Sequence, residues 1–295
     1  MGYFFAFGQA FTWACTSLIL RSLSTKLDPF LVNGLRAAFG LLFIIPMVAI
    51  MGAWGDYQLI TWPRLGALAG SVVIGGVFGD ALYVHSLKLL GVGRAFPITN
   101  TFPLFTVFFS FLLLGSELNW MMLAGAILTL LGVYFISRPK EHLENLGTAL
   151  PTGQLLKGTL VALGAAVAWG LTTVILSFGL RGSINPAVAN SVRVPFVVLF
   201  SSLGTLRNRG ARQSWKNLNR RTLLLLFLGG ILGWGISGSQ YLTAVQLIGP
   251  SKTAIISTTS PLFGVALSIP IFRERPTKYV WLGTILTIIG IVLVI

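Results

Sequence analysis

Apolar runs of about twenty residues recur along the whole of this sequence, each long enough for a helix to cross roughly 30 Å of hydrocarbon. They leave little room for charge: 55% of the 295 residues are hydrophobic and only 9% are charged. A soluble protein of this size needs charged residues to cover its surface, so this pattern excludes a soluble fold. We expect an all-α integral membrane protein.

Polar breaks divide the apolar runs into ten expected transmembrane helices. The expected spans are 3–22, 30–51, 65–88, 94–114, 119–137, 157–180, 186–206, 222–247, 252–272 and 277–295. One of the two long breaks, rich in Pro, Gly and Glu, falls between the fifth and sixth spans and is typical of a linker. The prediction is therefore a first five-helix repeat over 1–138, a linker over 139–156 and a second repeat over 157–295.

The two halves share a sequence pattern at a separation of 156 to 158 residues. The matching positions are Trp13 and Trp169, Asp28-Pro29 and Asn185-Pro186, Asn33 and Asn190, Arg36 and Arg193, Gly75 and Gly233, Tyr83 and Tyr241, Gly91 and Gly249, and Pro103-Leu104-Phe105 and Pro261-Leu262-Phe263. Because each half has an odd number of spans, the second half enters the membrane the opposite way. Inverted-topology repeats place a substrate site at the interface of the halves and permit alternating access.

Basic residues gather on one side of the expected membrane. The net charge is +14, and the connectors after spans 1, 3, 5, 7 and 9 hold sixteen Lys and Arg, against Arg64, Arg181 and Lys252 on the other side. This is the distribution of cytoplasmic loops, so it predicts both termini outside the cytoplasm and no nucleic-acid partner.

The order of these features resembles the EamA family of the drug/metabolite transporter superfamily over nearly the whole chain. The features that carry the resemblance are Trp13 and Trp169, the segments Pro29–Arg36 and Pro186–Arg193, the two Pro-Leu-Phe motifs, Glu117 and Glu274 before the last spans, and Gly125, Gly132, Gly283 and Gly290 within them. The resemblance implies a ten-helix exporter of amino acids or related small metabolites in a bacterial plasma membrane, driven by proton or substrate gradients. It also implies cytoplasmic termini, the reverse of the charge distribution.

Two spans at corresponding places in the halves carry proline among hydroxyl and amide side chains. Pro97, Thr99, Asn100, Thr101 and Pro103 lie in the fourth span, and Ser257, Thr258, Thr259, Ser260 and Pro261 lie in the ninth. Interrupted helices of this kind are tolerated where they line a cavity. We expect Thr99, Asn100, Ser257 and Thr258 to bind substrate, although the hydroxyls could instead bond the carbonyls that proline leaves.

Aromatic and amide side chains of other spans could complete such a cavity. Trp13, Trp169, Tyr83, Tyr241 and Gln240 could stack on a small organic substrate or hydrogen-bond to it. The alternative is that the aromatic rings serve only packing.

Three ionisable side chains fall inside the expected spans, where a charge costs roughly 2.5–3.5 kcal/mol. They are Asp80, Arg36 and Arg193. The expected depths of Asp80 and Arg36 differ by only about 3 Å at 1.5 Å per residue, so the two could pair. One hypothesis is that Asp80 titrates, with a proton as a candidate coupling ion, or that it contacts a substrate ammonium group. In either case Arg36 would be its counter-charge. The alternative is that Asp80 and Arg36 form a static structural pair.

Other functional classes remain open beside a metabolite exporter. An exchanger of organic anions or phosphorylated metabolites would need at least two cavity cations, which Arg36 with Arg193, or Arg94 with Lys252, could supply. An intramembrane enzyme has weaker support: Gly235-Ile236-Ser237-Gly238 matches a serine-protease motif, but no intramembrane His follows it. A scramblase or a structural subunit would instead carry lipid-facing polar grooves. No metal or cofactor motif is present, and both a monomer and a homodimer fit the sequence.

Overall fold

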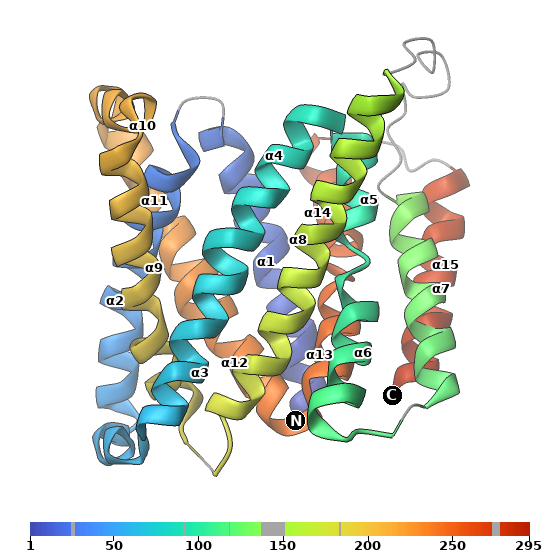
Figure 1. The fold of residues 1–295 in the computed structure, drawn as a ribbon, viewed down its shortest axis with the longest axis horizontal. Helices are drawn as coiled ribbons and strands as arrows, with labels where there is room; N and C mark the ends of the chain where they lie inside the picture. The colour runs from blue at the N-terminus through green and yellow to red at the C-terminus, as the bar shows by residue number, and fades with distance from the viewer. Residues whose placement is uncertain (25–26, 91, 118, 137–150, 183, 273–277) are drawn as a thin grey trace. The chain divides into compact units, whose positions relative to one another are not determined.

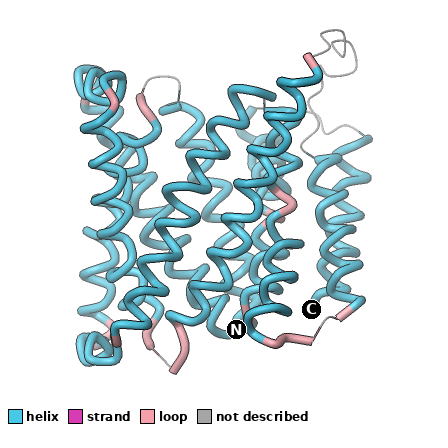
Figure 2. Tube along the Cα trace, in the orientation of Figure 1, coloured by secondary structure: helices cyan, strands magenta, loops and turns pink. Residues whose placement is uncertain are grey.

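The computed structural model describes residues 1–24, 27–90, 92–117, 119–136, 151–182, 184–272 and 278–295. Helices joined by short loops make up this described part, which contains no strand (Figure 2). Most of the predicted linker, residues 139–150, lies outside it.

Within the described residues, seven helical segments are long and apolar enough to cross a membrane. They are Gly2–Leu20, Pro29–Ile50, Trp62–Ser86, Pro97–Leu114, Thr152–Gly179, Pro186–Arg207 and Arg220–Ile248. Two shorter apolar helices, Trp120–Ile136 and Lys278–Val294, fall on the fifth and tenth expected spans. The chain is therefore an all-helical, multi-pass membrane protein, while the arrangement of ten spans in two repeats stays a prediction.

The helices follow one another along the chain with few long connections (Figure 1). They are α1 (Gly2–Ser24), α2 (Pro29–Ile50), η1 (Ala53–Leu59), α3 (Trp62–Val72), η2 (Val73–Gly79), α4 (Asp80–Leu90), α5 (Val92–Thr99), α6 (Phe102–Leu114), α7 (Trp120–Ile136), α8 (Thr152–Gly179), α9 (Pro186–Arg207), α10 (Arg209–Ser214), η4 (Trp215–Asn217), α11 (Arg220–Gly230), η5 (Ile231–Ser237), α12 (Gly238–Ile248), α13 (Pro250–Ser257), α14 (Ser260–Phe272) and α15 (Lys278–Val294).

The helices form two compact units that do not coincide with the two halves of the sequence. Unit 1 consists of Met1–Val73 and Ile175–Gly249, and unit 2 consists of Ile74–Val174 and Pro250–Ile295. Each unit therefore contains helices from both halves, and the continuous helical segments α3–η2–α4 and α8 pass from one unit into the other.

In unit 1, α2 packs against α9, and the two helices begin in the same way. The Asp28 carboxylate accepts a hydrogen bond from the Phe30 N–H, and the Asn185 side chain accepts one from the Ala187 N–H, both at 2.9 Å. In each helix a proline follows the capping residue, where its missing N–H is not needed. The repeated Asp28-Pro29 and Asn185-Pro186 pairs are thus two equivalent helix starts.

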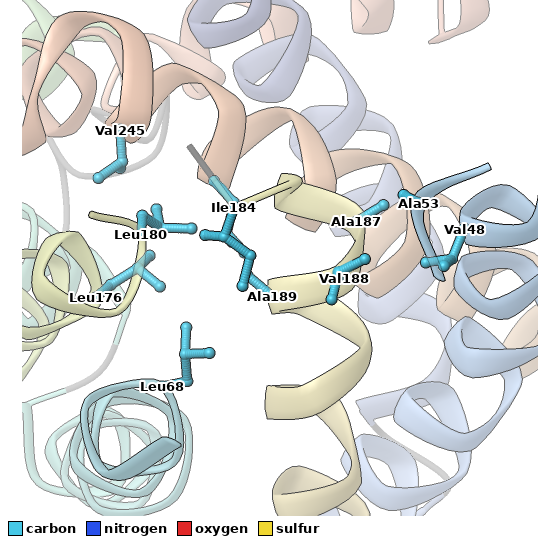
Figure 3. Packing of buried hydrophobic residues seen from close by; sticks show 11 residues of the cluster. Val48, Ala53, Leu68, Leu176, Leu180, Ile184, Ala187, Val188, Ala189 and Val245 are labelled. Carbon is cyan, nitrogen blue, oxygen red and sulfur yellow. The ribbon is translucent and has the colours of Figure 1, made fainter. Parts of the chain in front are cut away.

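The core of unit 1 is made of aliphatic side chains. Leu176, Leu180 and Ile184, at the end of α8 and just after it, pack with Leu68 of α3 and Val245 of α12 (Figure 3). All five are almost completely buried. The end of α8 is thereby fixed to the helices of unit 1.

In unit 2, α7 and α15 lie side by side along glycines that the sequence pattern pairs (Figure 1). A Cβ at Gly125 would lie 2.5 Å from the Gly290 carbonyl oxygen, and a Cβ at Gly132 would lie 2.5 Å from that of Gly283. The first glycine of one helix thus faces the second glycine of the other, so the helices are antiparallel. In the repeat pattern, Gly125 corresponds to Gly283 and Gly132 corresponds to Gly290. The Gly125–Gly290 contact and the Gly132–Gly283 contact are therefore equivalent to each other.

Candidate functional site

Two π-helical segments occupy equivalent places in the two halves. η2 covers Val73–Gly79 and η5 covers Ile231–Ser237, a separation of 158 residues at both ends. π-helical turns inside longer helices are frequent at functional sites. The sequence analysis had paired Gly75 with Gly233 across the two halves, but the sequence gave no signal for the change of helix type.

Each π-helical segment packs against an equivalent helix through an equivalent contact. In unit 2, a Cβ at Gly75 would lie 2.6 Å from Thr172 Oγ1 of α8. In unit 1, a Cβ at Gly233 would lie 3.1 Å from Thr16 Cγ2 of α1. Thr16 and Thr172 are 156 residues apart, so the same small-residue contact occurs once in each unit.

Asp80 follows η2 directly and begins α4. Its Oδ1 accepts a hydrogen bond from the Trp169 Nε1–H at 3.0 Å. The indole fits there because the preceding residue is glycine: a Cβ at Gly79 would lie 2.8 Å from Trp169 Cδ1. The predicted acid and one predicted tryptophan, 89 residues apart in the sequence, are therefore in direct contact within unit 2.

Two more aromatic rings surround Trp169. The Tyr83 ring lies 5.3 Å from it in a tilted arrangement, and the Phe102 ring lies 6.2 Å from it edge to face. Such geometries are the favourable ones for aromatic pairs. Asp80, Tyr83, Phe102 and Trp169 form what we call the acid–aromatic cluster. The sequence analysis had selected three of its members and missed Phe102.

Phe102 connects this cluster to the first interrupted helix. α5 ends at Thr99 and α6 begins at Phe102, with Asn100 and Thr101 in a turn between them. The matching interruption separates α13, which ends at Ser257, from α14, which begins at Ser260. Both predicted helix breaks are thus confirmed, and α13 packs against α6 within unit 2.

The hydroxyls at the breaks hydrogen-bond to their own helices. Thr101 Oγ1 donates to the Ile98 carbonyl at 2.6 Å, Thr258 Oγ1 to the Ile255 carbonyl at 2.6 Å, and Ser257 Oγ to the Thr253 carbonyl at 2.8 Å. This favours the alternative in which the hydroxyls bond backbone carbonyls, and it leaves oxygen lone pairs as acceptors. Thr99 is fully buried and Asn100 half-buried, and their binding of substrate stays a prediction.

The remaining predicted residues lie in unit 1. The Thr12 hydroxyl donates to Gln240 Oε1 at 3.0 Å, joining α1 to α12. Trp13 has 42% of its surface exposed, and the residue at the position matching Asp80 is Gly238. The carboxylate that holds Trp169 thus has no repeat counterpart near Trp13, so the two tryptophans are not equivalent in their surroundings.

Arg36 is buried in unit 1, where its Nε and Nη2 both donate to the Gly229 carbonyl at 3.2 Å. Asp80 belongs to unit 2, so the predicted pairing of Arg36 with Asp80 stays a prediction. Ser237, from the protease-like motif, donates its hydroxyl to the Gln9 carbonyl at 3.4 Å. Among the described residues, no group of three or more His, Cys, Asp or Glu side chains could hold a metal ion.

Comparison with known proteins agrees with this architecture. The EamA-like transporter family model matches residues 1–138 and 156–295. The chain is 24% identical to an uncharacterised transporter of Archaeoglobus fulgidus, over 97% of this chain and 95% of that protein. It is 22% identical to a probable amino-acid metabolite efflux pump of Escherichia coli, over 95% and 89% of the two chains. A crystal structure that is 20% identical superimposes with a TM-score of 0.75, over 99% of this chain and 95% of the other.

The apolar helices define a multi-pass membrane protein, and the family match places it among transport proteins. More specifically, the chain belongs to the EamA-like transporter family, within the drug/metabolite transporter superfamily.

Replacing Trp169 with phenylalanine tests the hydrogen bond to Asp80. Phenylalanine keeps an aromatic ring for Tyr83 and Phe102 but removes the indole N–H, and a hydrogen bond to a charged group contributes about 1.5–3 kcal/mol. We expect substrate affinity in a transport assay to fall about tenfold or more. Trp120→Phe, at a position 73% exposed, is the control. An unchanged affinity in Trp169→Phe would remove Trp169 from the site.

Proposed function

We propose that this protein is a secondary transporter that exports small metabolites such as amino acids by alternating access, from the cytoplasm across a bacterial plasma membrane. The observation that carries this proposal is the acid–aromatic cluster of unit 2, in which Asp80 accepts a hydrogen bond from Trp169.

A carboxylate in a membrane-spanning segment needs a reason to be there. Asp80 is the only acidic residue within the apolar helical segments of the described chain. Intramembrane acids are costly and commonly mark substrate paths or proton relays. Asp80 is also half-buried, so part of its surface remains accessible. A static structural role would be served more cheaply by a neutral hydrogen-bond acceptor.

The chemistry of the cluster favours a cationic or zwitterionic organic substrate. The Asp80 carboxylate can accept hydrogen bonds from an ammonium group, and the faces of Tyr83, Phe102 and Trp169 can attract a cation or cover an apolar side chain. An amino acid carries both an ammonium group and a side chain. The name of the Escherichia coli relative, a probable amino-acid metabolite efflux pump, supports the same substrate class and the outward direction.

Alternating access requires elements with two arrangements, and unit 2 contains candidates for them. The breaks at Asn100–Thr101 and Thr258–Thr259 interrupt two membrane helices at equivalent positions. Proline cannot donate to the carbonyl four residues before it, so Pro103 and Pro261 weaken each helix at its break. We propose that these breaks bend during transport and that a proton on Asp80 accompanies the cycle.

Counterflow and uptake in liposomes test the proposal. Purified protein would be given a panel of amino acids, with and without a pH gradient, and protein-free liposomes would serve as the control. We expect saturable flux of at least one amino acid and a rate that changes with the imposed pH gradient. Absence of flux for the whole panel, with protein shown to be folded, would contradict the proposal.

A second candidate function is the exchange of organic anions or phosphorylated metabolites. It is favoured by one observation, the presence of two buried arginines, Arg36 and Arg193, in unit 1. In the same liposomes, strict one-for-one exchange of a sugar phosphate against inorganic phosphate, with no amino-acid flux, would favour this candidate. Loss of that exchange in Arg36→Ala would assign it to the arginines.

A further inference from the structure

A buried arginine in unit 1 has no counter-charge among the residues that the structure describes. Arg193 lies in the first half of α9 with 8% of its surface exposed, and its Nε is buried with no hydrogen-bond partner among the described residues. Burying a guanidinium without a partner costs several kcal/mol. The described helices around Arg193 therefore supply no group that balances the charge of its guanidinium.

The acids of unit 1 are engaged elsewhere. Asp28 and Asp56 are the only acidic residues in its two sequence ranges. Asp28 caps α2 and accepts a second hydrogen bond from Asn208 Nδ2 at 3.2 Å. Asp56 Oδ2 accepts the Asn185 N–H at 2.7 Å, at the start of α9. Each carboxylate thus stabilises a helix terminus, and neither pairs with Arg193 in the described structure.

The repeat-equivalent arginine shows what Arg193 lacks. Arg36 donates two hydrogen bonds to the Gly229 carbonyl, so its guanidinium is held by the backbone of α11. Arg193 has the same place in the second half of the sequence but no such carbonyl among the described residues. A shared structural role would have given both arginines the same kind of partner.

Two polar residues, on α12 and on α9, are close to Arg193. The Tyr241 phenol on α12 interacts electrostatically with it. Asn190, one helical turn earlier on the same face of α9, donates through Nδ2 to the Trp234 carbonyl at 2.8 Å and to Ser239 Oγ at 3.3 Å. Its Oδ1 and the Trp234 Nε1 are buried with no partner in the described structure. An unmet donor on Arg193 and an unmet acceptor one turn earlier on the same helix are what a polar ligand can satisfy.

We propose that Arg193 and Tyr241 form an anion subsite in unit 1 that binds the carboxylate of the transported metabolite. A planar guanidinium matches a carboxylate with two parallel hydrogen bonds. A phosphate dianion would call for a second cation, and the other buried arginine of the unit, Arg36, is already hydrogen-bonded to a carbonyl. The identity of the ligand rests on the proposed transport function; the presence of an anion subsite does not.

Ligand binding to the purified full-length chain in detergent tests the subsite without a transport assay. The probes are the twenty amino acids, their C-terminal amides, sodium acetate and sodium phosphate, with gluconate as the bulk anion. We expect at least one amino acid to bind ten times or more tightly than its amide. We also expect acetate to compete with it at lower affinity. Amides that bind as well as the acids would overturn the proposal.

Variants on α9 locate the effect. Arg193→Gln is expected to remove the preference for the acid over the amide. Arg207→Gln, the same change at an exposed position of the same helix, is expected to keep it. Arg193→Lys keeps the charge without the planar fork and should retain part of the preference. An acid preference that survives in a folded Arg193→Gln protein would overturn the assignment. If Arg193→Gln does not fold, the comparison of acid and amide in the unmodified protein still decides.

The sources of the anion and the two proposals can be separated. If acetate binds as tightly as every amino acid, the subsite binds a free anion. That result would overturn the proposal that it binds the carboxylate of the transported metabolite. If phosphate displaces amino acids at a lower concentration than acetate does, the carboxylate proposal is also overturned, and exchange of phosphorylated metabolites is favoured instead. If an amino acid and its amide are transported at equal rates, the proposed transport function is supported and the proposed anion subsite is overturned. If carboxylates bind but no flux is measured, the proposed transport function is overturned and the proposed anion subsite is supported.

Discussion

Asp80→Asn is expected to lower amino-acid flux in liposomes by about ten- to one-hundredfold and to abolish its dependence on pH. Asparagine has nearly the same shape and keeps an oxygen that can accept the Trp169 N–H, so the cluster should stay assembled. It loses the negative charge, and a hydrogen bond to a charged group contributes about 1.5–3 kcal/mol, which corresponds to that range of rates. The measurement is initial uptake against substrate concentration at several pH values.

The control for this variant is the same change at an acid outside the cluster. Asp28→Asn replaces one good N-cap with another and leaves unit 2 untouched, so flux should stay within about twofold of the original. Flux and pH profile preserved in Asp80→Asn would show that Asp80 neither binds the substrate nor carries the proton. The acid would then be a structural partner of Trp169.

The parts of the fold that follow from local chemistry could be predicted from the sequence. Apolar length marks a membrane helix because it depends only on neighbouring residues. The starts of α2 and α9 follow from Asp28-Pro29 and Asn185-Pro186, and proline beside hydroxyls indicates the breaks at Asn100–Thr101 and Thr258–Thr259. Each of these signals lies within a few residues of the feature it predicts.

The site was predictable residue by residue but not as an assembly. Asp80 stands out as an acid in an apolar run, yet its contact with Trp169 depends on how η2 and α4 pack on α8. Phe102 carries no distinguishing signal, because the chain has 21 phenylalanines and most lie in similar runs. Arg36 also donates in unit 1 to the Gly229 backbone carbonyl, a contact that no side-chain pattern encodes, while its pairing with Asp80 stays a prediction.

The grouping of helices was also beyond the sequence pattern. The repeats predict equivalent helices, and the equivalent contacts of Gly75 with Thr172 and of Gly233 with Thr16 agree with that. They do not state which helices of different halves pack together. Both compact units take helices from both halves, because helix packing is decided by complementary surfaces and not by order along the chain.

Gly132→Ala is expected to lower the free energy of unfolding by about 3 kcal/mol, at the upper end of the cost of overpacking. The new Cβ would lie 2.5 Å from the Gly283 carbonyl oxygen and 2.6 Å from the Thr287 backbone nitrogen. Neither atom can move without displacing α15, so α7 and α15 must separate. Unfolding in detergent titrated with a denaturing surfactant would measure the change.

Gly70→Ala supplies the matched control, because nothing lies within 4 Å of a Cβ at that position of α3. There the higher helix propensity of alanine should leave stability unchanged or raise it by up to about 1 kcal/mol. A second variant separates side-chain from backbone crowding: Thr287→Ala removes Oγ1 but leaves both backbone atoms in place. Adding it to Gly132→Ala should therefore restore little stability. Full restoration would show that the two helices can adjust their backbones, and that the glycines do not set their separation.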